Sequence, residues 1–198
     1  MATVVVPFRS SDPKRRLQRV SARDRDRLAR AMLDDVLAAA GPIGEVLVVA
    51  PGTPLLPDGV RHVADPRRGQ GAAVQAALDA AAAAALAEPV LVVNADLPCA
   101  TTRDLLALVG AVPDGGIALV AAVDGTTNAL ALADGGLFEP VYGPGSAERF
   151  AALGPSRLLD SPNLVDDVDT IDDLERLRSR LGEHTGRVLA SLRLETAA

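Results

Sequence analysis

The stretch Val90-Leu91-Val92-Val93-Asn94-Ala95-Asp96-Leu97-Pro98 decides how this chain folds. Its first four residues are apolar β-formers without alternation, which is typical of a strand buried on both faces. Pro98 ends the strand because proline has no N–H group to donate, and Thr102 is expected to cap a following helix. Asp96 should therefore lie just beyond the carboxyl end of a central strand, where open α/β sheets bind their ligands. Taken alone, an Asp after a strand is better explained as a residue that only caps a turn. The other motifs must decide whether Asp96 binds a ligand.

Strand-like and helix-like segments alternate along the rest of the chain. Short apolar runs predict further strands at residues 3–7, 45–50, 61–64, 117–123 and 129–132. Helical spacing of apolar residues predicts helices at residues 21–40, 74–86, 102–109, 147–153 and 170–181. The tight turn at residues 124–128 predicts that the last two strands form an antiparallel pair. The predicted class is α/β, with a mixed, mainly parallel sheet flanked by helices.

The length and composition fit a single domain. The chain has 198 residues, of which 48% are hydrophobic and only 2% aromatic, so the core should consist of Ala, Val and Leu. This length suffices for one sizeable core and is short for two. We therefore predict one domain over residues 1–198, with a tail at 186–198 that is either a peripheral helix or frayed.

The charge balance is acidic, with 26 acidic against 20 basic residues and a formal net charge of −6. This balance argues against a nucleic-acid-binding protein, which would present a basic face. The bases nevertheless cluster, and clustered bases in an acidic chain indicate a local anion site. The clusters comprise Arg9, Lys14, Arg15, Arg16 and Arg19, followed by Arg67 and Arg68.

Cys99 is the only cysteine, so no internal disulfide can form. It follows Pro98 without an evident histidine partner, and we expect a small buried side chain rather than a nucleophile. No apolar run reaches the length that spans a membrane, and no signal peptide precedes the first strand. The expected location is a reduced cytoplasm.

Three aspartates form a candidate metal site: Asp96 after the central strand, and Asp167 and Asp169 in a later loop. In extended backbone Asp167 and Asp169 share one face, where their charges repel each other unless a cation lies between them. Mg²⁺ is the natural cation, because it prefers oxygen ligands and is used together with substrate phosphates. Alternatively, the two later acids only precede a helix that Thr170 and Asp173 cap, since acids favour helix N-termini.

A glycine-rich turn and a polar turn are further candidate ligand-binding segments. The turn Gly143-Pro144-Gly145-Ser146 lets a ligand approach the backbone. Ser146 is expected to be the N-cap of a short helix, whose free N–H groups attract anions. The turn Thr126-Thr127-Asn128 adds hydroxyls and an amide at a sheet edge. Ordinary turns have the same composition, so neither motif is specific by itself.

The motifs resemble a known family when they are taken in chain order. Neither a G-x-G-x-x-G motif after the first strand nor a Walker lysine motif is present. Their absence argues against a dinucleotide-dependent oxidoreductase and against a P-loop enzyme. From residue 3 to about residue 175 the chain instead resembles the phosphoenolpyruvate/2-phospho-L-lactate guanylyltransferases, which make an early intermediate of the deazaflavin coenzyme F-420. The resemblance rests on Lys14-x-Arg16-Leu17, Asp96-Leu97-Pro98, Gly125-Thr126-Thr127-Asn128-Ala129-Leu130, Tyr142-Gly143-Pro144-Gly145-Ser146 and Asp167-Val168-Asp169-Thr170.

This resemblance implies a Rossmann-like nucleotidyltransferase fold of the nucleotide-diphospho-sugar transferase type. It also implies GTP as the nucleotide, Mg²⁺ as the cofactor and pyrophosphate as the leaving group. By the same resemblance, the metal-binding acids are Asp96, Asp167 and Asp169, and Asp96 is catalytic. The positions that hold the phosphorylated three-carbon acid are Thr127, Gly143 and Ser146. Lys14 and Arg16 belong to the basic nucleotide loop, where they neutralise the triphosphate and are counted as catalytic.

Two segments depart from the family's pattern. The family has a lysine after the first strand's proline, and this chain has Arg9 instead, at a slightly shifted position. It keeps the charge, but arginine and lysine are not equivalent at a phosphate. Gly69-Gln70-Gly71 stands where the family has Gly-Leu-Asn, and the choice of nucleotide depends on whether this loop touches the base. Arg9, Gly69 and Gly71 are assigned to nucleotide binding with the basic loop.

The predicted reaction is transfer of GMP from GTP to the phosphate of a small phosphorylated carboxylic acid, phosphoenolpyruvate or 2-phospho-L-lactate. A molybdenum-cofactor or sugar-phosphate nucleotidyltransferase of the same fold is the first alternative, although these usually carry a glycine-rich basic signature after the first strand. A non-catalytic nucleotide-binding module is the second. No nucleic-acid or membrane partner is expected, and the oligomeric state stays open, a homodimer included.

Overall fold

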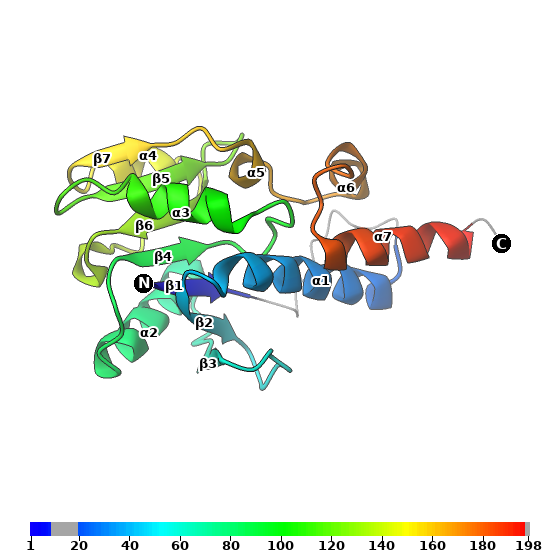
Figure 1. Ribbon diagram of the computed structural model, residues 1–198, viewed down its shortest axis with the longest axis horizontal. Coiled ribbons are helices and arrows are strands. Elements are labelled where there is room, and N and C mark those ends of the chain that lie inside the picture. Colours follow the sequence, from blue (N-terminus) through cyan, green and yellow to red (C-terminus); the bar gives the residue numbers. More distant parts are fainter. Residues whose placement is uncertain (9–19, 197–198) are drawn as a thin grey trace.

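The computed structural model describes residues 1–8 and 20–196 and contains one seven-stranded sheet covered by helices (Figure 1). The strand order is β3-β2-β1-β4-β6-β5-β7. β6 runs antiparallel to both of its neighbours, and the other pairs are parallel. This confirms the mixed, mainly parallel sheet and the antiparallel pair. The strands are β1 Ala2–Pro7, β2 Gly44–Ala50, β3 Val60–Ala64, β4 Val90–Val93, β5 Ile117–Ala121, β6 Thr127–Leu132 and β7 Ser156–Leu158.

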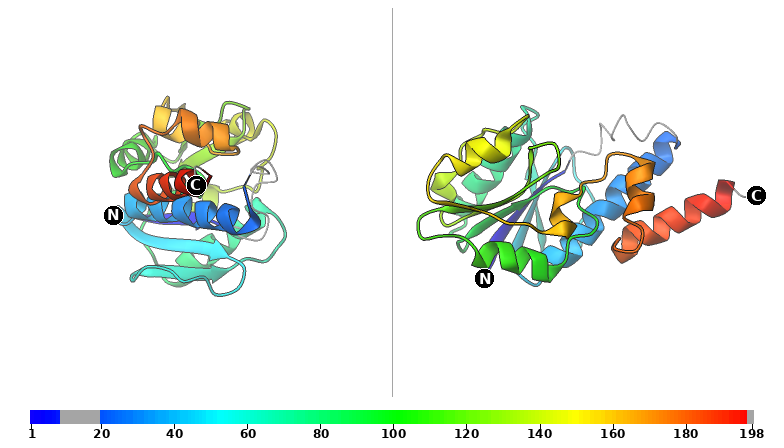
Figure 2. Two further views of the ribbon diagram at one scale, coloured as in Figure 1. Left: turned by 90° about the vertical axis from the view of Figure 1, so that its right-hand side faces the viewer. Right: turned by 90° about the horizontal axis from the view of Figure 1, so that it is seen from above.

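The helices form a layer on each face of the sheet and a third packing unit beyond it (Figure 2). α1, α3 and α5 contribute to the core on one face, and α2 and α4 to the core on the other. α1, α6 and α7 enclose the third core. Their bounds are α1 Ala22–Ala40, α2 Gln70–Ala83, α3 Thr102–Gly110, α4 Ser146–Ala151, α5 Pro162–Val165, α6 Ile171–Arg176 and α7 Glu183–Thr196, with a 3₁₀ turn at Gly135–Leu137.

The central strand β4 is buried on both faces, as its unbroken apolar run predicts. Leu91 and Val93 belong to the core that contains α1 and α3, whereas Val90 and Val92 belong to the core that contains α2. The side chains alternate between the two faces because successive residues of a strand point in opposite directions. β4 pairs with β1 on one side and with β6 on the other. The polar residues after Val93 therefore emerge in the middle of the sheet's edge.

Threonine and serine side chains cap three of the helices, as their positions before apolar repeats predict. Ser21 accepts a hydrogen bond from the N–H of Asp24, and Thr170 forms a complete capping box with Asp173. One cap was assigned to the wrong residue: Thr101, not Thr102, precedes α3. Thr101 has the extended backbone of an N-cap and accepts from the N–H of Asp104 at 3.2 Å. Thr102 is already helical, and its hydroxyl donates to the carbonyl of Ala39 at 2.9 Å.

The tail is helical and is held onto α1 by a buried carboxylate. Asp35 of α1 is only 5% exposed, and its two oxygens accept the N–H groups of His184 and Thr185 at 2.9 Å each. These N–H groups belong to the start of α7, whose free donors a carboxylate satisfies well. Leu189 and Leu192 then bury themselves against α1 in the third core. The tail is thus helical from Glu183 to Thr196, and it is packed against α1 as far as Leu192.

Several short elements carry no clear signal in the sequence. β7 is three exposed residues at the sheet edge, and α5 is a single turn. The antiparallel strand β6 begins at Thr127, two residues before the predicted start, and β5 ends at Ala121, two residues before its predicted end, so the turn between them is shifted by two residues and keeps the expected length. Within residues 1–8 and 20–196, none of the helices combines the length and the apolar character needed to cross a bilayer.

Candidate functional site

The residue after β4 ties three segments together at the carboxyl edge of the sheet. The backbone N–H of Asn94 donates to the carbonyl of Asn128 at 3.0 Å, and its amide nitrogen donates to the carbonyl of Thr127 at 3.2 Å. Its amide oxygen accepts from Gln70 at 2.7 Å. Since Gln70 begins α2 and Thr127 begins β6, this one side chain brings the Gly69-Gln70-Gly71 loop and the Thr127 segment to the same place.

The glycine loop before α2 packs closely against the segment that precedes α4. Gly69 has φ +99°, a conformation that favours glycine over other residues. A Cβ on Gly71 would lie 2.7 Å from the Cβ of Pro140 and 3.1 Å from its Cα, so no larger residue fits without displacing backbone. Both glycines predicted to bind nucleotide therefore have a structural requirement, and Gly71 lies beside the segment that leads to Gly143.

The backbone also brings together the two segments that carry the predicted metal-binding acids. The N–H of Val168 donates to the carbonyl of Asp96 at 3.0 Å. The side chain of Val168 is fully buried in the third core, which anchors the flanking residues Asp167 and Asp169, both partly buried. In the part of the chain that the structure describes, no three His, Cys, Asp or Glu side chains converge to hold a metal ion. The magnesium site stays a prediction, with its two segments now adjacent.

A neighbouring acid has a structural role that the sequence does not reveal. Asp166 accepts hydrogen bonds from Arg176 and Arg180, each at 2.8 Å. Burial raises the pKa of the Asp166 carboxyl, but the hydrogen bonds from Arg180 and Arg176 outweigh it and hold that pKa below its ordinary value. These two ion pairs fix the start of the loop that carries Asp167 and Asp169 to the end of α6 and to the segment after it.

The two hydroxyls assigned to the acceptor meet each other in the interior. Thr127 is 3% exposed and Ser146 is 0% exposed, and their oxygens lie 3.0 Å apart. The prediction that Ser146 is the N-cap of α4 is wrong. Gly145 is the N-cap, with φ +70° and ψ +20°, and Ser146 is the first helical residue, with its side chain turned inward. The pair ties the start of β6 to the start of α4.

The neighbouring Asn128 is a structural residue. It is 2% exposed, and its amide nitrogen donates to the carbonyls of Leu164 and Val165 at 3.0 and 2.9 Å. A buried amide group needs such partners, because leaving its N–H donors without a hydrogen bond costs about 1–3 kcal/mol. The polar turn of the sequence thus contributes Thr127 to the candidate site and Asn128 to the attachment of α5.

Arg149 and an aromatic cluster shape the loop that contains Gly143. Arg149 donates to the carbonyls of Val141, Tyr142 and Pro144. Beneath the loop, the ring of Tyr142 packs edge-on against Phe150 with centroids 5.0 Å apart, and Phe138 completes the cluster. Burial raises the pKa of the Tyr142 phenol above its usual range.

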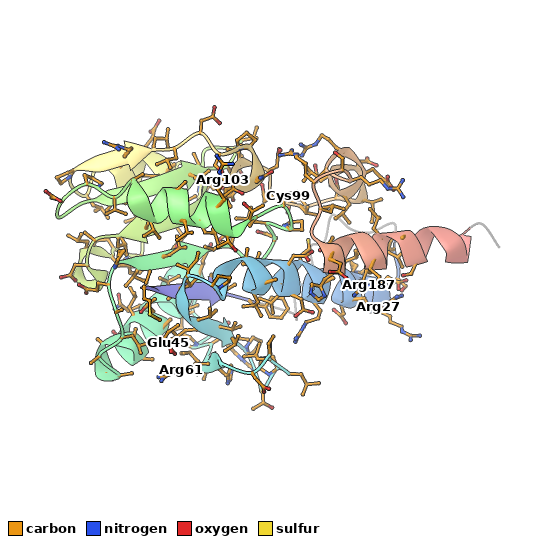
Figure 3. The ribbon with its side chains drawn as sticks, viewed as in Figure 1. Arg27, Glu45, Arg61, Cys99, Arg103 and Arg187 are labelled. Atoms are coloured by element: carbon orange, nitrogen blue, oxygen red, sulfur yellow. The ribbon has the colours of Figure 1, made fainter. Side chains whose placement is uncertain are left out.

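Cys99 is a packing residue, as expected. It is 2% exposed in the third core (Figure 3). Burial raises the pKa of its thiol to about 11, so the nucleophilic thiolate is scarce at neutral pH. The remaining predicted site residues, Arg9, Lys14 and Arg16, lie outside the described residues.

Sequence comparison identifies the family. The model of the MobA-like NTP transferase domain matches residues 25–190. A phosphoenolpyruvate guanylyltransferase of Nocardia farcinica is 36% identical over 88% of this chain and 83% of its own length. A 2-phospho-L-lactate guanylyltransferase of Methanosphaerula palustris is 33% identical over 96% of this chain and 88% of its own. The chain belongs to the phosphoenolpyruvate/2-phospho-L-lactate guanylyltransferase family. It is therefore a nucleotidyltransferase, which confirms the predicted class of enzyme.

Solved structures support the fold assignment. A Desulfovibrio desulfuricans protein assigned to the nucleotide-diphospho-sugar transferases superposes with a TM-score of 0.75 at 19% identity, covering 100% of this chain and 96% of its own. The 2-C-methyl-D-erythritol 4-phosphate cytidylyltransferase of Thermus thermophilus gives a TM-score of 0.60 at 18% identity, covering 95% and 99%. The predicted fold of the nucleotide-diphospho-sugar transferase type is thus confirmed.

The sequence alone did not identify Asn94, Gln70 and Arg149 as organisers of the site. Asn94 and Gln70 have a weak signal, since each is a polar residue at an expected junction of strand, loop and helix. Arg149 has a better one, because it follows a Gly-Pro-Gly-Ser turn by one helical turn and can reach that turn's carbonyls. A side chain that bonds to backbone carbonyls cannot be recognised from a sequence motif, because its partners do not depend on residue type.

Proposed function

We propose that this chain transfers GMP from GTP to the phosphate of phosphoenolpyruvate or 2-phospho-L-lactate and releases pyrophosphate, a step of coenzyme F-420 biosynthesis. One observation carries the proposal. Asn94 joins the Gly69-Gln70-Gly71 loop to Thr127, so the segments assigned to the two substrates meet at the carboxyl end of β4. The names of the relatives at 33–36% identity supply the two acceptors.

The reaction asks mainly for positioning. A non-bridging oxygen of the acceptor phosphate attacks the α-phosphorus of GTP in line, the bond to the β-phosphate oxygen breaks, and pyrophosphate leaves. The acceptor phosphate is already an anion at neutral pH, so no general base is needed. Holding the two phosphates in line and neutralising their charge accounts for most of the catalysis expected in phosphoryl transfer.

The acids at the carboxyl edge fit a magnesium ion. Their donors are hard carboxylate oxygens, and the hydrogen bond between Val168 and Asp96 places the two acidic segments side by side. Mg²⁺ is usually held by only one or two carboxylates together with substrate phosphates and water, so a convergence of three acids is not required. Asp96, with Asp167 or Asp169, would hold the ion. When bound, it would supply positive charge to the phosphates.

The other assigned residues divide between the two substrates. Lys14, Arg16 and Arg9 are proposed to neutralise the triphosphate and the departing pyrophosphate, with Gly69 and Gly71 next to the nucleotide. Gly143 and the buried Thr127–Ser146 pair are proposed to form the acceptor side. Because both hydroxyls are buried and bonded to each other, their main contribution would be to set the backbone that faces the acceptor.

The experiment is magnesium-dependent release of pyrophosphate with a matrix of substrates. GTP, ATP and CTP are each paired with phosphoenolpyruvate, 2-phospho-L-lactate, 3-phosphoglycerate and a hexose 1-phosphate. Release only from GTP, and only with one of the first two acids, is the expected result. Release with a sugar phosphate would support the sugar-phosphate alternative, and binding of GTP without release in any combination would refute guanylyl transfer.

A further inference from the structure

Arg149 of α4 bonds its guanidinium to the loop that precedes its own helix. Its Nε and one terminal nitrogen donate to the carbonyl of Val141 at 3.1 and 2.8 Å, and the other terminal nitrogen donates to the carbonyl of Pro144 at 2.7 Å. A longer contact of 3.4 Å reaches the carbonyl of Tyr142. One exposed side chain thus gathers three carbonyl groups from a loop of four residues.

The direction of these carbonyls determines the direction of the amide groups of the loop. In a planar trans peptide the C=O of one residue and the N–H of the next point in opposite directions, and none of the peptides in this loop is cis. The N–H groups of Tyr142, Gly143 and Gly145 therefore point away from the guanidinium. Among the described residues, no backbone carbonyl accepts a hydrogen bond from these three groups.

The side of the loop opposite Arg149 is built to meet an anion. Gly143 and Gly145 have φ +115° and +70°, and a Cβ on either would lie toward Arg149, 3.8 and 3.6 Å from its terminal nitrogens. The glycines are therefore required by backbone conformation. Pro144 contributes no N–H group, so the amides that can meet an anion on this side are those of Tyr142, Gly143 and Gly145. The hydrogen bond between Thr127 and Ser146 fixes this surface next to β6.

We propose that Arg149 is a positioning residue for the acceptor: it holds the carbonyls of Val141, Tyr142 and Pro144 so that the amides of Gly143 and Gly145 point at the phosphate or carboxylate of the phosphorylated acid. This inference rests on the proposed guanylyl transfer. Lysine cannot replace arginine here, because a single ammonium lacks the planar fork that bonds several carbonyls in fixed directions. The proposed function assigns GTP to other segments, so GTP binding should not depend on Arg149.

The test separates acceptor from nucleotide. Arg149→Lys and Arg149→Gln are compared with the parent and with Arg61→Ala. Arg61 is the control because it is also an exposed arginine with polar contacts: it forms an ion pair with Glu45 at 3.4 Å, on the edge strand opposite β7 (Figure 3). We measure KM for phosphoenolpyruvate by pyrophosphate release, GTP affinity by calorimetry, and amide hydrogen exchange over residues 141–147.

Both Arg149 variants should raise the acceptor KM by roughly tenfold to a hundredfold, the scale for losing charge-assisted hydrogen bonds. GTP affinity should stay within about twofold of the parent, and exchange over 141–147 should become faster. Arg61→Ala should change none of the three. An acceptor KM equal to the parent's, or an equal loss of GTP affinity, would overturn the assignment. If the parent itself releases no pyrophosphate, the proposed function fails. Hydrogen exchange tests Arg149 independently of that outcome: unchanged exchange over residues 141–147 in the variants would show that Arg149 does not order the loop.

Discussion

The nucleotide side and the acceptor side of the candidate site differ in what holds their backbone. On the nucleotide side, Gln70 at the start of α2 is joined to Asn94, the residue after β4, by an amide–amide hydrogen bond. On the acceptor side, two buried hydroxyls bond to each other, and Arg149 gathers three carbonyls. The chain itself thus holds the acceptor side with several polar contacts, and we expect ligands to supply more of the order on the other side. Substitutions should reveal this difference.

The largest effect is expected at Asp96, where the two sides meet. Asp96→Asn removes a negative charge at the carboxyl edge while preserving size, and should lower the rate of pyrophosphate release by about 10²- to 10³-fold, the scale for one electrostatic contact to a transition state. The melting temperature should change little. Asp79→Asn, on the exposed face of α2, is the control. Unchanged magnesium-supported GTP binding in Asp96→Asn would remove Asp96 from the metal site.

The next effect concerns the acceptor loop. Gly143→Val forces a branched side chain into φ +115°, with a strain of about 1–3 kcal/mol, and should turn the loop's amides away from the acceptor. The acceptor KM should rise about tenfold or more, with GTP affinity nearly unchanged. Gly59→Val is the control, because Gly59 has φ +83° and open space around it in a distant loop. Loss of GTP binding with normal acceptor saturation would mean that the two sides are assigned the wrong way round.

A smaller effect is expected on the nucleotide side. Gln70→Leu removes the donor to Asn94 and should weaken GTP binding by about three- to tenfold, consistent with one hydrogen bond of about 1 kcal/mol. The acceptor KM should stay near that of the parent. Gln75→Leu is the control, since Gln75 lies about one and a half turns later on α2 and its exposed side chain donates to Asp79. If the acceptor KM rises as much as GTP affinity falls, the two sides are one coupled unit.

Regular elements were predictable because their signals are local. The unbroken apolar run of β4, the caps at Ser21 and Thr170, and the tight turn before β6 each follow from a few neighbouring residues. The Thr101 cap was missed by one residue because two threonines stand side by side, and only backbone conformation distinguishes the N-cap from the first helical position. β7 and α5 are too short to show a periodicity.

The sequence suggested candidate residues for the site, but not the contacts that these residues make. The sequence pointed to Gly143, Ser146 and Thr127, but not to the burial of the two hydroxyls against each other. Arg149 acts on backbone carbonyls, and no spacing of side chains reveals such partners. In the same way, Asp35 caps α7 from 150 residues away in sequence, which only the packing of α7 on α1 makes apparent. Long-range polar contacts of this kind can be identified only once the fold is known.

The smallest expected effect lies in the loop between α5 and α6, which carries the later acids. Hydrogen bonds from Arg180 and Arg176 outweigh burial and keep the pKa of Asp166 below its ordinary value. A carboxyl whose pKa is lowered by folding stabilises the protein above its unfolded pKa, and this stabilisation is lost as the pH falls through the folded pKa. Asp166→Asn imitates the protonated carboxyl, so its melting temperature should be below that of the parent at pH 7.

That difference should stay constant down to about pH 5 and shrink below about pH 4, where the parent's carboxyl becomes protonated as well. Because the arginines are partly exposed, the effect should be a few degrees at most and should weaken with added salt. Asp114→Asn, in an exposed turn before β5, is the control and should show no such pH dependence. A melting difference that persists unchanged to pH 3 would show that Asp166 stabilises the loop through its shape and hydrogen bonds, and that its charge contributes nothing.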